Sequence, residues 1–168
     1  MQYWSLHPLA PWAEQLRFHN IREAGEAREL MQRPWAGQLS VPDDVLQLSF
    51  DNAEAHGISP AALVDDDWSG CQAWSEAFDG AAVIAPSAAL PGANSLVLFG
   101  PLVRSPYGVA PFDPTVDVPC DPVADLSIVP PDLLRFVRWR GVPHEGYQAW
   151  VTGGSAPEPP VVTVDRHM

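Results

Sequence analysis

The N-terminal part of the chain repeats apolar side chains at the spacing of a helix. The repeat lies in the stretch 9-LAPWAEQLRFHNI-21. Its members fall at i, i+3, i+7 and i+10: Leu9, Trp12, Leu16 and His19. Such a spacing places side chains on one helix face. Pro11 fits the first helical turn, where a backbone N–H has no partner in the helix. The pattern therefore predicts a helix over residues 9–21.

Two short apolar runs frame a turn in the middle of the chain, in 82-AVIAPSAALPGANSLVLFGP-101. The runs cover residues 82–85 and 95–99, and Pro91 and Gly92 lie between them. Because Pro and Gly are typical turn residues, the pattern predicts two strands joined by a tight return. Ser87 follows the first of these strands. From its position alone it is either a turn residue or a site residue.

Weaker patterns predict the remaining elements. Apolar and polar side chains alternate over residues 45–50, which indicates a strand. Helical patterns are shorter and carry more charge or turn residues, over residues 21–33, 51–56, 59–60 and 70–78. Residues 133–139 fit a late strand or a short helix, and no periodicity survives between 101 and 131. Residues 155–160 are typical of a flexible tail.

The composition suits one domain with a hydrophobic core, since 168 residues include 46% apolar side chains. The net charge is −12, and residues 36–130 hold thirteen acids with Arg104 as their one basic residue. Such a surface repels a nucleic-acid duplex or an anionic membrane. The chain has no lysine, which excludes Schiff-base chemistry and a lysine-bearing phosphate loop. We therefore expect no direct nucleic-acid and no membrane partner.

Other features bear on where the protein works. No apolar run approaches the length of a membrane helix, and the stretch MQYWSLHPLAPW lacks the pattern of a signal peptide. Cys71 and Cys120 are too few for a disulfide framework and favour reduced thiols. We expect a cytoplasmic protein.

The sequence gives little support for a metal-binding site. The triple Asp65-Asp66-Asp67 lacks the ligand spacing of a calcium loop, so a capping cluster at a helix N-terminus is favoured. The five histidines are scattered, and none pairs with another at the spacing of a zinc site. We expect no metal centre.

Glu14 has two interpretations. It lies one position from the apolar stripe of the predicted helix and three before Arg17. The two side chains either form an i, i+3 pair on a solvated face, or Trp12 and Tyr3 partly desolvate the carboxylate. A carboxylate of the second kind can stabilise positive charge that develops on a sugar ring.

The order of several motifs resembles the RES domain, a family named for an arginine, a glutamate and a serine. The matching pieces are Y-x-S-x(5)-W-A-E-x-x-R from Tyr3, the strand V-L-x-L-S, D-D-W-x-x-C-Q-A, and P-S-A-x(5)-N-S-L-V-L-F. The likeness covers roughly residues 3–100, and its last segment is the most specific. It implies one RES-like domain over residues 1–150, followed by a tail over 151–168.

The resemblance implies an α+β fold like that of ADP-ribosyltransferases, with a small, largely antiparallel β core flanked by helices. It also implies the toxin of a toxin–antitoxin pair, which consumes NAD as substrate by hydrolysis, phosphorolysis or ADP-ribosyl transfer. The partner would then be an antitoxin protein, itself typically a DNA-binding protein. The oligomeric state stays open.

The resemblance also assigns residues to roles. Glu14 and Ser87 are the catalytic candidates, with Glu14 at the ribose and Ser87 at the nicotinamide side or against Glu14. Tyr3, Arg17 and Asn94 are the candidates for NAD binding. Tyr3 would stack on the nicotinamide ring.

One departure from the family pattern leaves alternatives open. The family's arginine lies on a strand upstream of the position of Tyr3, and this chain does not contain it. Arg17, Arg22, Arg33 or the arginines of 133-LLRFVRWR-140 could contact the NAD phosphates instead. The chain is either an NAD-consuming enzyme, whole or shortened, or a non-catalytic RES-like protein that binds a partner.

Overall fold

The computed structural model describes residues 2–30, 35–37, 45–99, 120–122, 128–130 and 132–161. Four α-helices occur in these ranges: α1 (Ala10–His19), α2 (Ala24–Glu29), α3 (Ser69–Ala77) and α4 (Glu145–Thr152). Short 3-10 turns are η1 (Glu54–His56), η2 (Ala61–Val64) and η4 (Leu133–Arg135). The strands are β1 (Gln2–Ser5), β2 (Trp35–Gly37), β3 (Leu46–Gln47), β4 (Ala82–Pro86), β5 (Asn94–Leu98) and β6 (Cys120–Pro122). None of the helices in this part of the chain has the length and apolarity needed to cross a membrane.

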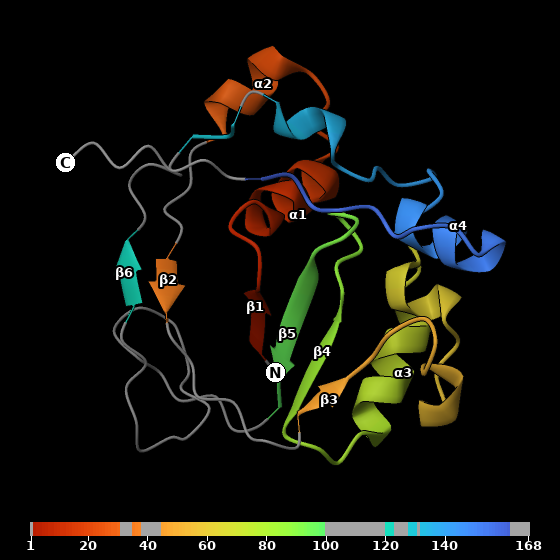
Figure 1. Cartoon of the computed structure of the whole chain (residues 1–168). Helices are drawn as coiled ribbons and strands as arrows, with labels where there is room; N and C mark the ends of the chain where they lie inside the picture. The colour runs from red at the N-terminus through yellow and green to blue at the C-terminus, as the bar shows by residue number, and fades with distance from the viewer. Residues whose placement is uncertain are drawn as a thin grey trace.

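Four strands form the main sheet, in the order β1-β5-β4-β3 (Figure 1). Strands β4 and β5 are antiparallel, with Ala85 opposite Ser95, and β1 adds antiparallel to β5. Strand β3 pairs in parallel with β4. The sheet is therefore mixed and largely antiparallel, and with its flanking helices it makes an α+β domain. Strands β2 and β6 form a separate antiparallel pair.

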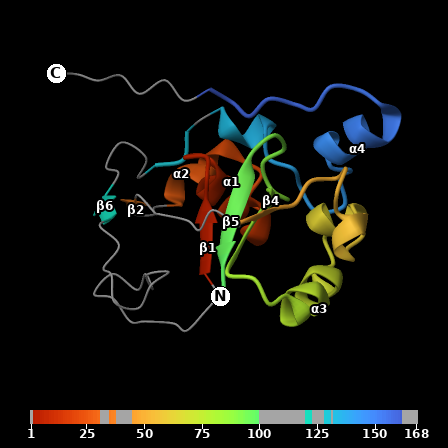
Figure 2. The same ribbon diagram turned by 60° about the horizontal axis from the view of Figure 1, so that its bottom comes forward.

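The two faces of the main sheet pack against different parts of the chain. Val83 lies in a cluster with Ala53 and Ile58, on either side of η1, and with η2, and Trp74 and Phe78 of α3 are partly buried against it. Leu96 and Leu98 project to the opposite face and pack with Trp4. In both views α3 and α4 lie on the side of β4 that faces away from β1 (Figures 1 and 2).

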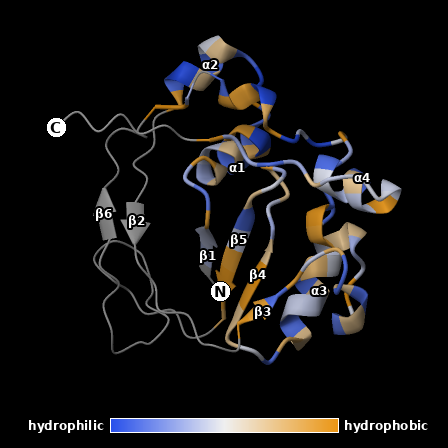
Figure 3. Cartoon of the chain, viewed as in Figure 1, coloured by the Kyte–Doolittle hydropathy of each residue, from blue (hydrophilic) through white to orange (hydrophobic). Residues whose placement is uncertain are grey.

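Helix α1 forms the third part of the core, at the end of the sheet where β5 begins. Leu16 and Trp12 are almost fully buried there, with Leu133 of η4 and Leu90 of the β4–β5 turn. Strand β5 changes along its length from hydrophilic at Asn94 to hydrophobic at Leu98 (Figure 3). Its polar end therefore lies toward α1, which is where a polar site can form.

Most of the strong sequence patterns are confirmed. The helices predicted over residues 9–21 and 70–78 are α1 and α3, and the two framed strands are β4 and β5. The short helical segments correspond to η1, which ends at Gly57 with φ 78°, and to η2. Of the two possibilities for residues 133–139, a single helical turn, η4, is present.

The weaker patterns overstate the lengths of their elements. The charged helix predicted over 21–33 is limited to α2, and residues 31–34 lie outside the described part. The strand predicted over 45–50 is only the two residues of β3. Asn52 explains that end: its side chain accepts a hydrogen bond from Ser49 N at 2.8 Å and donates one to Gln47 O at 2.8 Å, which turns the chain away. Most of residues 101–131, predicted as loop, also lies outside the described ranges.

After α4, the C-terminal segment runs back to the N-terminal part of the chain, near His7. Pro160 O accepts a hydrogen bond of 3.0 Å from His7 Nε2, because His7 Nδ1 already accepts from Leu9 N. Gly92 has φ 87°, and a Cβ there would lie 2.4 Å from Pro157 O, so the turn after Pro91 admits only glycine. The flexible tail and the domain boundary at 150 stay predictions.

We expect Leu16→Ala to lower the free energy of unfolding by about 2–5 kcal/mol, because Leu16 of α1 is fully buried in the same cluster as Leu133 of η4. Leu6→Ala is the matched control, since 53% of that side chain is exposed. Chemical denaturation of the three proteins measures the effect. Equal losses from the two variants would show that the core does not lie where the structure places it.

Candidate functional site

Glu14 of α1 and Ser87 after β4 meet although they are 73 residues apart. The Ser87 hydroxyl donates to Glu14 Oε1 at 3.3 Å. Two features hold the serine: its backbone N–H donates to Ala93 O at 2.9 Å, and its Oγ accepts from Leu90 N at 3.2 Å. Ser87 is 2% exposed. The turn between the strands therefore presents one fixed hydroxyl to one carboxylate of the neighbouring helix.

The surroundings of Glu14 disfavour its charge. Desolvation by burial raises the pKa of Glu14, and the charge of Arg17 and the hydrogen bond from Ser87 oppose that rise only in part. The structure thus agrees with a desolvated Glu14, but Tyr3, which was expected to help desolvate it, lies elsewhere on the sheet. The alternative, a solvated pair with Arg17, is wrong because Arg17 is itself buried and bonds elsewhere.

Arg17 is joined to the carboxylate of Asp66. Arg17 Nη2 lies 2.6 Å from Asp66 Oδ1, and Arg138 Nη1 lies 2.7 Å from the same oxygen. Gly141 N donates to Asp66 Oδ2 at 2.6 Å. The two arginines are 4% and 9% exposed. One carboxylate therefore connects α1, the segment before α3 and the segment after η4.

Asp66 stays ionised in this arrangement. Desolvation acts to raise the pKa of Asp66, but the hydrogen bond from Gly141 and the guanidinium groups of Arg17 and Arg138 together lower it. Its neighbours have the local roles expected of a capping cluster. Asp67 Oδ1 accepts from Ser69 N at 3.0 Å, at the start of α3, and Asp65 Oδ1 accepts from Asp66 N at 2.6 Å. The part of the chain that the structure describes contains no group of side chains that could hold a metal ion.

His144 fixes the other side of the Ser87 turn. Its Nδ1 accepts from Tyr147 N at 3.2 Å, which caps α4, so Nε2 carries the hydrogen that it donates to Ser87 O at 3.0 Å. Desolvation, helped by the charges of Arg138 and Arg17, lowers the pKa of His144, against the hydrogen bond to Ser87 O that raises it. His144 is therefore a neutral, buried link between α4 and Ser87.

Tyr3 and Asn94 do not join this group directly. Tyr3 is opposite Val97 and, across β5, in line with Val83, so it lies on the sheet face that carries α3. Two strands and four residues separate it from Ser87, a distance of about 16 Å between the Cα atoms. Tyr3 is 73% exposed, and its pKa is raised by desolvation and by the Cys71 thiol. Asn94 is exposed. It precedes Ser95, which lies on the same sheet face as Tyr3, so Asn94 projects toward the other face.

Sequence reasoning did not single out Asp66 or His144 for the site, and it named Arg138 only as one of several arginines that could contact the NAD phosphates. Asp66 belongs to a triple that was interpreted as a helix cap, and in the structure Arg138 binds Asp66 instead. Helix α4 was not predicted, so His144 had no element to cap. The sequence marks these residues only by their type. The ion pairs of Asp66 join it to Arg17, 49 positions away, and to Arg138, 72 positions away, so they leave no local pattern.

Comparison with known proteins gives one partial match. The chain is similar to the probable NAD(+) phosphorylase Rv3189 of Mycobacterium tuberculosis, with 35% identity over 91 residues. The match covers 52% of this chain and 43% of the relative, so the chain spans less than half of that protein's length. No family model matches the chain. No solved structure matches it either.

We expect Asp66→Asn to lower the free energy of unfolding by about 3–5 kcal/mol near neutral pH, because it leaves two buried guanidinium groups without their carboxylate. Asp67→Asn is the control: it keeps an oxygen for Ser69 N at an exposed position, so we expect little change in the free energy of unfolding. The pKa of Asp66 is lowered, so its stabilisation is present above its ordinary pKa and is lost as the pH falls. Urea titrations of both variants at about pH 7 and about pH 2, below the ordinary pKa of an aspartate, test this, and a constant difference between parent and Asp66→Asn would contradict it.

We expect Glu14→Gln to raise the melting temperature at about pH 7, since glutamine keeps the shape of the protonated acid without the buried charge. The folded-state pKa of Glu14 is raised, so the destabilising effect of its ionised form is absent at low pH and appears as the pH rises. The gain should therefore shrink between about pH 7 and about pH 4. Glu76→Gln, at an exposed position of α3, is the control. A variant less stable than the parent at neutral pH would show that the ionised Glu14 carboxylate does not destabilise the folded state.

Proposed function

We propose that this chain belongs to the RES-type proteins that consume NAD by breaking the bond between nicotinamide and ribose. The observation that carries the proposal is the contact between the Ser87 hydroxyl and the Glu14 carboxylate. It joins the two residues that the RES resemblance assigns to catalysis. The similarity to a probable NAD(+) phosphorylase supports the same substrate.

The reaction requires mainly one negatively charged side chain that the protein holds at a fixed position. When the C1′–N bond breaks, its electron pair leaves with the nicotinamide nitrogen, and positive charge develops on the ribose ring. A carboxylate held in a desolvated position stabilises that charge more than it would in water. Water then adds through its oxygen to the same carbon and releases a proton to solvent, giving ADP-ribose; a phosphate oxygen that adds instead gives the phosphate ester of ADP-ribose at that carbon. The relative's name favours phosphate as the acceptor.

Ser87 acts as a positioning residue in this proposal. Its hydroxyl is held by the backbone N–H of Leu90 and directs its hydrogen to Glu14 Oε1. Such a hydrogen bond favours the ionised carboxylate and holds one rotamer. His144 supports the serine from its backbone side.

The non-catalytic alternative has one observation in its favour. Arg17, the nearest arginine in sequence to Glu14, is buried and bonded to Asp66, so it does not contact the NAD phosphates in this arrangement. A protein without a phosphate contact could keep the fold and bind a partner instead. If the chain is active, its consumption of NAD makes it harmful to its own cell, and we propose an antitoxin protein as its partner.

The test is release of nicotinamide from NAD, with and without inorganic phosphate. We expect Glu14→Gln to slow the release by about 10²- to 10³-fold, as for the loss of one preorganised electrostatic group. Ser87→Ala should slow it less, by about 10-fold, because it removes one hydrogen bond to the charged Glu14 carboxylate. Glu76→Gln should match the parent. Equal rates for the parent and Glu14→Gln would remove Glu14 from the mechanism, and no release by the parent would favour the non-catalytic alternative.

A further inference from the structure

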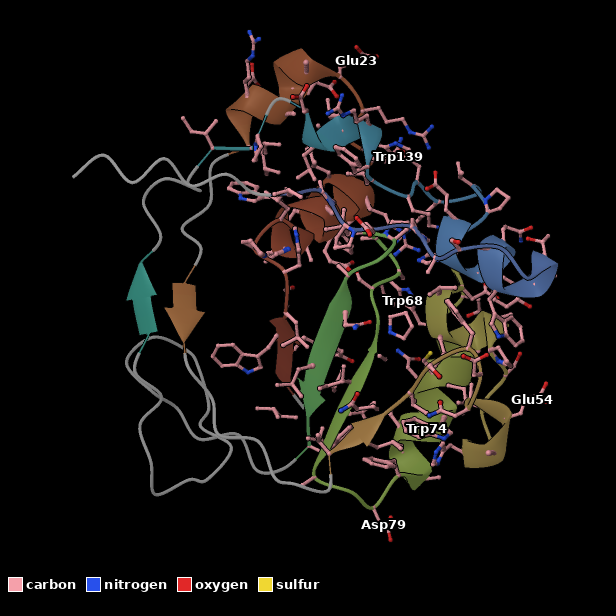
Figure 4. The ribbon with its side chains drawn as sticks, in the orientation of Figure 1. Glu23, Glu54, Trp68, Trp74, Asp79 and Trp139 are labelled. Atoms are coloured by element: carbon pink, nitrogen blue, oxygen red, sulfur yellow. The ribbon has the colours of Figure 1, made fainter. Side chains whose placement is uncertain are left out.

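Three side chains from separate segments gather on the surface beside the Asp66 ion pairs. Arg140 Cζ lies 5.6 Å from the centre of the Trp68 ring and 6.0 Å from that of Phe18. Phe18 is 59% exposed and Trp68 48% exposed. Trp68 lies beside the start of α3, to the right of β4 in the view of Figure 4. The group therefore presents one guanidinium and two aromatic rings to solvent.

The charge of Arg140 is not neutralised by an ion pair within the described part of the chain. The nearby arginines Arg17 and Arg138 share Asp66, and Arg135 lies 4.0 Å from Asp132. The acids that precede Trp68 bond elsewhere, to guanidinium groups and to backbone N–H groups. Their partners are Arg17, Arg138 and Gly141 for Asp66, Ser69 for Asp67, and the backbone of residues 66 and 67 for Asp65. Arg140 is thus an exposed guanidinium with no ion-pair partner among the described residues, and it can bind an anion.

The group lies next to the proposed reaction site. Phe18 follows Glu14 by four residues on α1, which places their Cβ atoms about 6 Å apart on one helix face. Arg140 directly precedes Gly141, whose N–H is held by Asp66 Oδ2 at 2.6 Å. The same carboxylate binds Arg17 of α1. The position of Arg140 relative to Glu14 is therefore fixed by the Asp66 contacts rather than by a loose loop.

We propose that Phe18, Trp68 and Arg140 bind the ADP half of NAD. A guanidinium matches the oxygens of a pyrophosphate with paired hydrogen bonds, and aromatic side chains stack on a purine ring. The proposal rests on the proposed function, because it takes the reacting ribose to lie at Glu14. It also gives the chain a phosphate-binding arginine from its C-terminal third, in place of Arg17.

The experiment is calorimetric titration of the full chain with ADP at low salt. We expect Arg140→Gln to weaken ADP binding by about 10- to 100-fold, the effect of one charge-assisted hydrogen-bond pair. Arg140→Lys should recover only part of the affinity, because lysine keeps the charge but not the planar fork. Arg135→Gln is the matched control: that arginine is also exposed, on the same segment, and lies over the Phe136 ring at 4.8 Å.

Nicotinamide release by the same proteins separates this proposal from the proposed function. If Arg140→Gln binds ADP as the parent and Arg135→Gln do, or if the parent binds no ADP, the ADP site is overturned, whatever the release assay gives. If ADP binding depends on Arg140 while the parent releases no nicotinamide, the ADP site stands and the proposed function fails. If the parent releases nicotinamide and Arg140→Gln raises KM for NAD with kcat little changed, both are supported.

Discussion

The arrangement of the described chain depends on the carboxylate of Asp66. It accepts from two buried guanidinium groups and one backbone N–H, and these come from α1 and from the segment between η4 and α4. Removing one partner from such a cluster leaves an uncompensated buried charge, so the three segments keep one relative placement. Glu14 lies on α1 one turn before Arg17. The Asp66 contacts therefore also determine where the Glu14 carboxylate meets Ser87.

Two kinds of carboxylate lie close together on this framework. Asp66 is stabilised in its ionised form and holds the fold, whereas Glu14 is destabilised in its ionised form. A group whose ionised form weakens the folded state, and which is still held in place by a serine, is typical of a functional site. The contrast supports a structural role for Asp66 and a chemical role for Glu14.

Local patterns predicted the parts of the fold that local physics controls. Leu9 to Leu16 at helical spacing, and the Pro91-Gly92 turn between apolar runs, correctly gave α1, β4 and β5. The length of β3 depends on the Asn52 side chain, and α4 depends on its His144 cap and on packing, so neither shows in hydrophobic periodicity. The Glu14–Ser87 pair came from the order of motifs. The Asp66 contacts join distant segments through ion pairs and one backbone hydrogen bond, and no sequence spacing encodes them.

We propose that NAD is cleaved where Glu14 meets Ser87. The most direct measurement is a crystal structure of the Glu14→Gln variant with NAD, which is expected to bind the substrate and cleave it slowly. We expect the nicotinamide ribose to lie beside residue 14 and the Ser87 hydroxyl. Density for NAD on another surface, with the Glu14 and Ser87 side chains untouched, would contradict it.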